Sequence, residues 1–326
     1  MRLFFFPSCP RGGYVNPYCI NYKKSFSKWF AVEELDDPIT IMKSLTLFHY
    51  AFVSDVFVLN WIENARLWKF GLIQFALVIL SLRVIKFRKK RIVWMLHNLN
   101  PHEGRTKYSD KIKNYLFKNS TLIVSHSVDA AAYARNRTKK RVEYICHPIC
   151  LPNYKCLKEN VEQSDVLIWG SVLPYKGVAE FLEVAKNAGL NEKIIVLGKC
   201  SDPLLERRIQ SYVASNVTFV NRFAEYSEIA SFVKQARYVL FPYIGDCFSS
   251  SGALMDTIAM NGGIPVGPNR GAFKDLAHEG LCITYKSWDE LIDIIRKPNQ
   301  KKDYQEFVDT NSWENFAKKM YSLIND

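Results

Sequence analysis

Short apolar runs alternate with longer segments of helical periodicity along the whole chain. In the first half, these runs predict strands at residues 2–6, 56–59, 92–96, 122–125 and 144–146. In the second half, they predict strands at residues 166–170, 193–198, 217–220, 238–241, 264–267 and 281–284. Such alternation is typical of parallel strands joined by crossover helices, because both faces of a parallel sheet are buried. The pattern therefore predicts two α/β units in tandem.

A stretch without strong periodicity, residues 148–163, separates the two series of predicted strands. We therefore expect an N-terminal domain over residues 1–152 and a C-terminal domain over residues 153–308. An apolar stripe at helical spacing marks the last segment, residues 309–326, as a helix that packs back toward the N-terminal domain. The length of 326 residues agrees with two domains, since a usual domain has about 100–200 residues.

The distribution of charge along the chain suggests a binding partner. The chain carries 44 Lys and Arg against 32 Asp and Glu, a formal net charge of +12. Residues 1–160 hold 26 basic and 11 acidic residues, a net +15, whereas residues 161–326 hold 18 and 21, a net −3. This asymmetry suggests an anionic partner: a membrane surface, nucleic acid or a phosphorylated substrate. A composition of 48% hydrophobic and 23% charged residues excludes a disordered, fibrous or multispanning membrane protein.

The longest apolar run, residues 70–82, is interrupted by Gln74 and is shorter than the ~20 residues that a membrane-spanning helix needs. A dense basic cluster, residues 83–91, follows it, and a second such cluster occupies residues 135–141. Two interpretations stay open for the run. It is either a helix that lies in a membrane interface or a buried helix packed on a sheet, with a solvated basic end.

Eight cysteines are scattered without paired spacing, and the chain does not open with the pattern of a secretion signal. These features predict a reduced, cytoplasmic protein. Cys146, His147, Cys150 and Cys156 lie close in sequence but lack the paired spacing of a zinc site. Buried or incidental thiols are therefore the favoured interpretation of this cluster.

In doubly wound sheets, ligands bind beyond the carboxyl ends of the strands, where loops enter helices. The first such junction of the second half runs from Gly170 and Ser171 to Lys176 and Gly177, where a helix is expected to begin. Backbone N–H groups and the helix dipole already favour an anion there, and Lys176 adds a positive charge. The junction suggests a diphosphate site, although a lysine and a glycine before a helix are also common without one.

The second junction carries Ser249, Ser250, Ser251 and Gly252 at the expected start of another helix. Small side chains and unbonded N–H groups suit a phosphate cradle, and Asp256, one turn into the helix, could reach a ribose hydroxyl. Serines also serve as plain helix N-caps, so both interpretations stay open.

Further junctions carry glycine or isolated polar groups. Residues 261–271 are rich in glycine, which lets backbone approach a ligand closely, and their Arg270 could meet a phosphate; a simple turn is the alternative. In the first half, Gly12 and Gly13 follow the opening strand, and His97 follows the strand at residues 92–96. The other polar residues at these strand ends are Asn98, His102, Glu103 and His126.

Taken together, the junctions of the second half resemble the nucleotide-binding half of the retaining glycosyltransferases of the GT-B fold, specifically family 4. That family shows a strand ending in glycine, followed at the same spacing by Lys-Gly, as at Gly170 and residues 176–177. The family's next motif, an acidic helix followed by a strand, is also matched, although this chain has extra residues between the alanine and the glycine of the motif. The matching residues are Pro242, Asp256, Ala259, Gly263, Pro265 and Val266. The resemblance covers about residues 165–325.

Two departures from the family pattern affect donor binding. Ser171 stands where the family has arginine before Lys-Gly, so Arg270 or Lys199 would supply the second cation. Phe248 stands where the first acid of the paired-acid motif falls, and Asp246 lies two residues away. The resemblance therefore implies that sugar recognition differs here from the usual pattern.

The resemblance implies an α/β fold of two Rossmann-like domains that face each other across a cleft. It implies transfer of a sugar, with retention and without metal or other cofactor, from a nucleotide-diphosphate sugar to a glycan or polyprenyl-diphosphate-linked acceptor. The implied catalytic residues are His97 and Lys176. The implied donor-binding residues are Gly12, Gly13, Gly170, Ser171, Lys176, Arg222, Asp246, Ser249, Ser250, Ser251, Gly252, Asp256 and Arg270. The implied acceptor-side residues are Asn98, His102, Glu103 and His126.

We expect this activity in the synthesis of a bacterial lipopolysaccharide, capsule or glycolipid. The basic N-terminal half would hold the enzyme peripherally at the anionic inner face of the membrane. No Asp-x-Asp pair, a usual ligand of divalent cations in sugar transferases, follows a predicted strand, which favours metal independence. Two alternatives stay open: a basic nucleic-acid-binding protein, for which no motif is recognised, and a nucleotide-sugar epimerase of the same fold.

Overall fold

A computed structural model describes residues 1–7, 17–33, 42–97, 106–149, 161–245, 250–298, 300 and 302–326 of the chain. By their internal contacts, these residues form two compact units. The first unit comprises Met1–Pro148, Cys247–Ser250 and Asn311–Asp326, and the second comprises Ile149–Asp246 and Ser251–Thr310. The domain boundary predicted at residue 152 lies outside the described residues.

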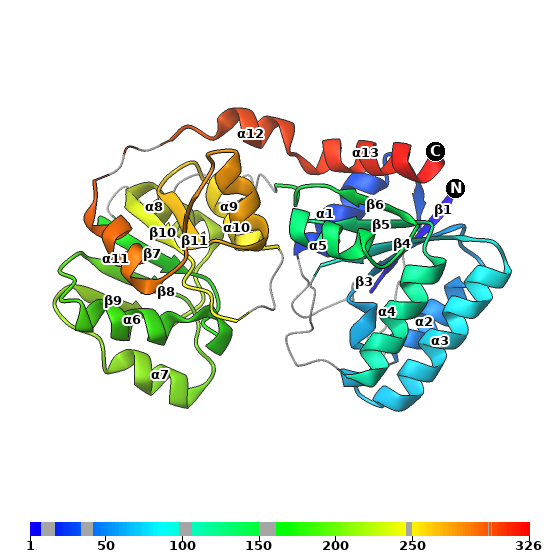
Figure 1. The fold of residues 1–326 in the computed structure, drawn as a ribbon, viewed down its shortest axis with the longest axis horizontal. Helices are drawn as coiled ribbons and strands as arrows, with labels where there is room; N and C mark the ends of the chain where they lie inside the picture. The colour runs from blue at the N-terminus through cyan, green and yellow to red at the C-terminus, as the bar shows by residue number, and fades with distance from the viewer. Residues whose placement is uncertain are drawn as a thin grey trace. The chain divides into compact units, whose positions relative to one another are not determined.

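The first unit is built on a six-stranded parallel sheet with the strand order β2-β1-β3-β4-β5-β6 (Figure 1). Its strands are β1 (Arg2–Phe6), β2 (Ala31–Val32), β3 (Val56–Asn60), β4 (Arg91–Leu96), β5 (Leu122–Ser125) and β6 (Arg141–Tyr144). In this order, the winding of the chain reverses between β1 and β3. The carboxyl ends of the strands beside such a reversal are where doubly wound sheets bind ligands.

The opening strand lies in the interior of this unit because its side chains fill both faces of the sheet. Residues 3–6 are all buried, as a strand covered on both sides requires. The ring of Phe4 stacks on Tyr50 with 4.4 Å between ring centroids. On the opposite face, Phe5 packs on Tyr22 at 4.2 Å. The two faces therefore carry separate aromatic layers.

Helices cover both faces of the first sheet. They are α1 (Pro17–Phe26), α2 (Lys43–Tyr50), η1 (Ile62–Leu67), α3 (Gly71–Phe87), α4 (Lys107–Asn119), α5 (Val128–Arg135) and α13 (Trp313–Asn325). Residues of α2 to α5 share one core cluster with the sheet. On the other face, Phe316 of α13 lies 6.3 Å from Tyr22 and 5.9 Å from Phe26 of α1, measured between ring centroids. The C-terminal helix is thus part of the first unit.

The second unit contains another six-stranded parallel sheet, with the order β12-β11-β10-β7-β8-β9. Its strands are β7 (Ser164–Trp169), β8 (Ile194–Leu197), β9 (Val217–Val220), β10 (Ala236–Leu240), β11 (Ile264–Pro268) and β12 (Ile283–Tyr285). This is the order of a dinucleotide-binding Rossmann sheet, with the winding reversal between β7 and β10.

Helices also cover both faces of the second sheet (Figure 1). They are η2 (Pro174–Lys176), α6 (Val178–Asn187), α7 (Pro203–Gln210), α8 (Tyr226–Gln235), α9 (Gly252–Ala259), α10 (Gly271–His278), α11 (Trp288–Arg296) and α12 (Gln305–Thr310). Residues of α6, α7 and α11 share one core cluster, whereas α8, α9 and α10 contact β7, β10 and β11 from the other face.

The two parallel sheets confirm the fold class predicted from the apolar runs, and one predicted strand was wrong in position. Residues 144–146 were expected to form it, but β6 spans Arg141–Tyr144. β6 lies at the edge of its sheet, where Arg141 and Glu143 reach solvent and form an ion pair of 3.1 Å. Charged residues are favoured on edge strands, so an apolar run cannot mark this one.

The apolar run at residues 70–82 forms most of α3, the longest helix of the described residues at 17 residues. Among the described residues, no helix is long and apolar enough to cross a membrane. Neither interpretation of the run assumed that it crosses one. The structure buries one face of α3 and exposes the other.

Candidate functional site

Two of the predicted junctions meet beside the winding reversal of the second sheet. Gly170 and Lys176 follow β7, and residues 242–245 follow β10, which pairs with β7. The N–H of Ile244 donates a hydrogen bond of 2.9 Å to the carbonyl of Tyr175, which ties the two loops together. The fold therefore gathers two segments, about 70 residues apart in sequence, at the place where a Rossmann sheet binds its ligand.

Glycines keep this place open. Gly170 has φ +99°, and a Cβ added there would lie 3.4 Å from Nζ of Lys176. At the end of the neighbouring strand β8, a Cβ on Gly198 would stand only 1.8 Å from the carbonyl oxygen of Gly170. Gly177 has φ +65°, and its added Cβ would lie 2.1 Å from the carbonyl oxygen of Pro242. The ammonium group of Lys176 therefore lies over the end of β7, where glycines leave the backbone without side chains.

The environment of Lys176 suits an anion. Burial lowers the pKa of its ammonium to about 8, because the charged form is poorly solvated there. Its Nζ lies 5.9 Å from the ring centroid of Tyr243. Helix α6 begins at Val178, so the N–H groups and dipole of its first turn add to the same positive field. A phosphate bound here would stabilise the charged ammonium, since an opposite charge favours the ionised form.

Asp256 lies one turn into α9 as a partly buried carboxyl. Burial raises its pKa to about 7, and a hydrogen bond of 3.0 Å donated by the Tyr226 hydroxyl opposes this rise. The next residue, Thr257, accepts a hydrogen bond of 2.9 Å from Nε1 of Trp169, the last residue of β7. Asp256 is thus held at a defined position relative to the strand that leads to Lys176.

For the serines before α9, the sequence left two interpretations open, a phosphate cradle and a helix N-cap. Ser251 is the N-cap of α9, since its hydroxyl accepts a hydrogen bond of 3.3 Å from the N–H of Leu254. Its side chain therefore serves the helix. A Cβ added to Gly252 would meet no atom of the described residues within 4 Å. Ser250 precedes the cap and is half-buried.

A cavity of about 390 Å³ lies at the carboxyl ends of β10, β11 and β12. Tyr243, Arg270, Lys286 and Trp288 are among the residues that line it. Nη2 of Arg270 donates a hydrogen bond of 3.1 Å to the carbonyl of Tyr243, whose ring lies beside Lys176. Tyr243 therefore connects Lys176 with Arg270, which was expected, with Lys199 as the alternative, to supply the second cation.

The side chain of Arg222 forms hydrogen bonds near the start of α8, the helix that follows it in the chain. Its Nη1 donates hydrogen bonds of 2.8 Å to Glu228 and 3.2 Å to the carbonyl of Phe223. The guanidinium group is exposed and forms a paired contact with the Glu228 carboxylate. The donor contact that the resemblance implies for Arg222 stays a prediction.

In the first unit, Asn60 joins the strand ends at the winding reversal. Its Nδ2 donates a hydrogen bond of 2.9 Å to the carbonyl of Phe6 at the end of β1. Its Oδ1 consequently faces Nε2 of His97, 2.8 Å away. Because Oδ1 can only accept, Nε2 of His97 carries the proton and Nδ1 is the acceptor nitrogen of the ring. The ring also stacks on Trp61 with 4.3 Å between centroids.

His126 is oriented by a similar argument. Its Nδ1 lies 2.8 Å from the carbonyl of Ile145, which only accepts, so Nδ1 is protonated. Its Nε2 then accepts a hydrogen bond of 3.0 Å from the hydroxyl of Tyr18. Burial lowers the pKa of His126 to about 3. Burial, with a smaller contribution from the neighbouring His126, also holds the pKa of His97 well below its usual value. The two predicted histidines are therefore neutral at physiological pH, with fixed tautomers.

A third histidine, which sequence reasoning did not place here, completes the cluster. The ring centroid of His147 lies 5.1 Å from that of His126 and 5.3 Å from that of Tyr18. Burial lowers its pKa to about 4. Asn311, just before α13, donates a hydrogen bond of 2.8 Å to the carbonyl of His147. The C-terminal helix is thus fastened directly beside the histidines.

Sequence reasoning also missed Asn60, Tyr18 and Tyr243. Asn60 carried a usable signal, because it is the single polar residue that ends an otherwise apolar strand. Tyr18 and Tyr243 carried none, since aromatic residues are common throughout the chain and only the fold brings these two to the strand ends.

Several predicted site residues lie outside the described residues. They are Gly12, Gly13, Asn98, His102, Glu103, Asp246 and Ser249. Ser171 is described and exposed beside Gly170. In the part of the chain that the structure describes, no group of three or more His, Cys, Asp or Glu side chains is placed to hold a metal ion. Cys146 there is a half-buried thiol without a disulfide.

By sequence, the chain matches no protein-family profile and no curated protein. By structure, it is similar to glycosyltransferases along its whole length. HepE from Anabaena, in complex with UDP and glucose, has a TM-score of 0.63 at 13% identity, covering 100% of this chain and 96% of that one. A trehalose-6-phosphate protein from E. coli, bound with UDP-2-fluoro glucose, has a TM-score of 0.69 at 10% identity, covering 100% and 99%.

A glycosyltransferase from Rickettsia africae is similar as well, with a TM-score of 0.67 at 12% identity over 100% of this chain and 98% of that one. These neighbours and the two parallel six-stranded sheets show that the chain has the GT-B fold of glycosyltransferases. At 10–13% identity, this likeness is one of fold.

Proposed function

We propose that the protein transfers a sugar from a nucleotide-diphosphate sugar to an acceptor hydroxyl. The observation that carries this proposal is the partly buried ammonium group of Lys176, which lies over the glycine-lined end of β7 at the start of α6. Such a group is positioned to meet a diphosphate. Asp256 supplies a carboxylate that can accept hydrogen bonds from ribose hydroxyls. Two of the neighbouring structures hold UDP or a UDP-sugar, which favours UDP as the nucleotide.

In the proposed reaction, the bond between the sugar and the diphosphate breaks and negative charge grows on the leaving phosphate. Lys176 and the N–H groups of the first turns of α6 and α9 stabilise this charge, which is the main contribution of the protein. Retention follows if the leaving diphosphate takes the proton of the acceptor hydroxyl on the same face of the sugar. These cationic and N–H groups supply the stabilisation that a divalent ion gives in other transferases, so we propose a metal-independent reaction.

The first unit is proposed to bind the acceptor, a glycan or a polyprenyl-diphosphate-linked oligosaccharide. Neutral His97, which Asn60 holds at the carboxyl end of β4, is proposed to contact the acceptor. The excess of basic over acidic residues in residues 1–160 favours an anionic acceptor at the inner face of a bacterial membrane. The product would then be a surface polysaccharide or glycolipid.

A thermal-shift screen of UDP, GDP, ADP and CMP tests nucleotide binding. We expect UDP at about 100 times its dissociation constant to raise the melting temperature of the second unit by about 5 °C, because a ligand that binds only the folded state stabilises it. The other nucleotides should give smaller shifts at the same concentration. If none of the four nucleotides shifts the transition, the donor assignment is wrong.

The pH dependence of donor binding tests Lys176 and Asp256 together. Asp256 must be ionised to accept from ribose hydroxyls, and its pKa of about 7 makes affinity rise from pH 6 to 7. Lys176 must be protonated, and its pKa of about 8 makes affinity fall above pH 8. Calorimetry with UDP-glucose, whose phosphates stay ionised throughout, should therefore give an optimum between these values. In Asp256→Asn the acid limb should disappear and the alkaline limb should remain, whereas an unchanged profile would contradict the assignment.

Product analysis separates transfer from the epimerase alternative. Incubated with UDP-glucose and no acceptor, a transferase leaves the sugar stereochemistry unchanged apart from slow hydrolysis to UDP and free sugar. An epimerase converts the donor to its stereoisomer at equal rate with or without an acceptor. Chromatography of the nucleotide sugars distinguishes the two outcomes.

A further inference from the structure

Helix α3 is apolar on its exposed side as well as on its buried side. Its buried residues include Gln74 and Ser81, while Ile73, Leu80 and Phe87 on the opposite side are 56%, 45% and 87% exposed. These three exposed residues are spaced by seven positions and therefore form one stripe along the helix. A helix of a soluble protein normally places apolar residues inward and polar residues outward. The exposed stripe calls for a partner.

The buried polar residues hold α3 in this orientation. Oε1 of Gln74 accepts a hydrogen bond of 3.2 Å from the N–H of Ser44 in α2, and its Nε2 donates one of 2.7 Å to the carbonyl of Lys69. The hydroxyl of Ser81 donates 2.7 Å to the carbonyl of Leu77. Turning the helix to bury its apolar stripe would break the contact with α2 and expose the sheet-facing residues. The exposure of the stripe is thus built into the packing.

Further apolar side chains continue the surface at both ends of α3. Phe70 and Leu72, at its start, are 55% and 54% exposed, and Phe52, at the end of the neighbouring α2, is 47% exposed. Helices α2 and α3 lie side by side on the same side of the first sheet (Figure 1). We call the exposed parts of Phe70, Leu72, Ile73, Leu80 and Phe87 the α3 face.

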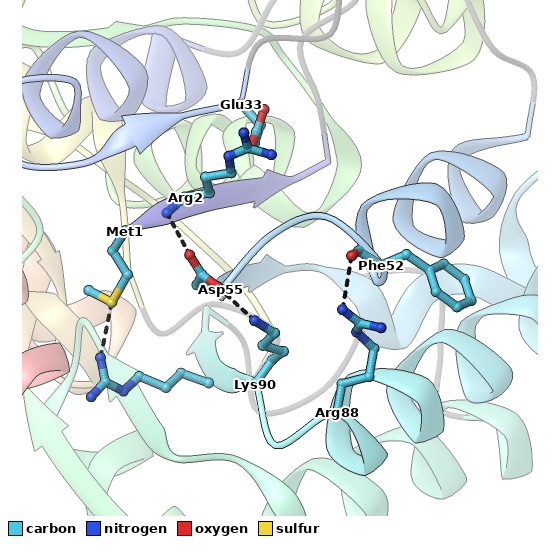
Figure 2. A network of polar contacts seen from close by, with 8 residues as sticks. Met1, Arg2, Glu33, Phe52, Asp55, Arg88 and Lys90 are labelled. Atoms are coloured by element: carbon cyan, nitrogen blue, oxygen red, sulfur yellow. Dashed lines mark hydrogen bonds and ion pairs between the residues drawn. The ribbon is translucent and has the colours of Figure 1, made fainter.

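Positive charge gathers at the C-terminal end of the α3 face. The sequence of α3 contains no acidic residue, and Arg83, Lys86 and Lys89 are exposed in and after its last turns. The nearby carboxylate of Asp55 is already engaged: it lies 2.7 Å from Nζ of Lys90 and accepts 3.0 Å from the N–H of Arg2 (Figure 2). The Lys90 hydrogen bond lowers the pKa of Asp55, so this carboxylate stays ionised and paired.

In the second basic cluster of the sequence, three arginines are held by contacts within the protein. Arg141 forms ion pairs with Glu143 at 3.1 Å and with Asp326 at 3.7 Å. Arg135 donates 3.1 Å to the carbonyl of Val142, and the guanidinium of Arg137 covers the Tyr133 ring at 3.5 Å. Those guanidinium groups are engaged within the protein, whereas the cations of α3 lie beside an apolar surface.

We propose that the α3 face docks on an anionic lipid bilayer, with its apolar side chains inserted at the level of the lipid headgroups and its cations on the phosphates. An apolar stripe flanked by lysine and arginine matches this chemistry in both parts: the stripe gains from burial and the cations from anionic lipid. The inference goes beyond the proposed sugar transfer and does not depend on it.

Vesicle sedimentation of the full chain tests the proposal without donor or acceptor. We expect binding to phosphatidylcholine vesicles that contain about 30% phosphatidylglycerol, and binding about tenfold weaker or more to pure phosphatidylcholine. Phe87→Gln should weaken binding to the anionic vesicles about tenfold, and the combined variant Ile73→Gln, Leu80→Gln, Phe87→Gln about 100-fold, because each removes an inserting side chain. The folded state should be retained, since all three side chains are exposed.

The matched control replaces exposed apolar residues elsewhere. Leu204→Gln and Phe223→Gln remove side chains that are 70% and 81% exposed in the second unit, and vesicle binding should not change. Binding that survives the combined α3 variant would overturn the proposal. So would a chain that ignores anionic vesicles and instead forms a dimer in solution that the combined variant dissociates. Sugar transfer to a soluble acceptor should be the same in the wild type and the α3 variants, which separates this test from that of the proposed reaction.

Discussion

Lys176→Ala should lower kcat/KM for sugar transfer about 1000-fold, because it removes the cation that meets the growing charge on the leaving diphosphate. Lys176 is the charged side chain placed over the bare end of β7, and its ammonium already resides in a poorly solvated position. A steady-state assay that measures UDP release in the presence of acceptor gives the rate. The melting temperature should change little, since removal of a partly buried charge does not leave a partner without its ion pair.

Lys186→Ala is the control for this loss. Lys186 lies in the last turn of α6, the helix that begins directly after Lys176, and its side chain is exposed with its Nζ 5.9 Å from the Tyr212 ring. Transfer by this variant should equal that of the wild type. If Lys176→Ala retained the activity of the Lys186→Ala protein, the ammonium group would not contact the donor and the proposed site would be wrong.

Gly198→Ala should strongly destabilise the second unit. The added Cβ would stand 1.8 Å from the carbonyl oxygen of Gly170, so the ends of β7 and β8 must move apart. Overpacking against backbone costs about 3 kcal/mol, which lowers the melting temperature by about 6–12 °C for a unit of this size. Calorimetry measures the shift, and donor affinity should fall with it because Gly170 carries the loop of Lys176.

Gly252→Ala separates this clash from the general cost of replacing glycine. Its added Cβ meets no atom of the described residues within 4 Å, and the residue begins α9. The melting temperature should stay the same or rise slightly, since alanine favours helix over the unfolded chain. Equal melting temperatures for Gly198→Ala and Gly252→Ala would contradict the close approach of β7 and β8.

The fold was accessible from the sequence because parallel strands buried on both faces are apolar throughout. The runs at β1, β3, β4 and β5 stand out for this reason. Where a strand lies at an edge, as β6 does, its outward residues are charged and the run disappears. The junction of Lys176 could also be predicted from the sequence, since its glycine, its lysine and the helix start that follows lie close together in the chain.

The contacts that complete the candidate site join residues far apart in the chain. His97 is held by Asn60, and His126 by Tyr18 and Ile145, so the tautomers of both rings depend on which strand ends adjoin. No spacing within the sequence reports such a contact. The same holds for Asp256, whose raised pKa comes from burial beside Tyr226.

The sequence by itself determined the two α/β units, the junctions after their strands and the basic character of the first half, because these are properties of neighbouring residues. It left two interpretations for the apolar run of α3. Only the tertiary structure decided between its faces: hydrogen bonds from Ser44 and to Lys69 hold Gln74 inside, and leave Ile73 and Phe87 outside. An apolar helix has no preferred side of its own, so the packing of its few polar residues sets which face meets solvent.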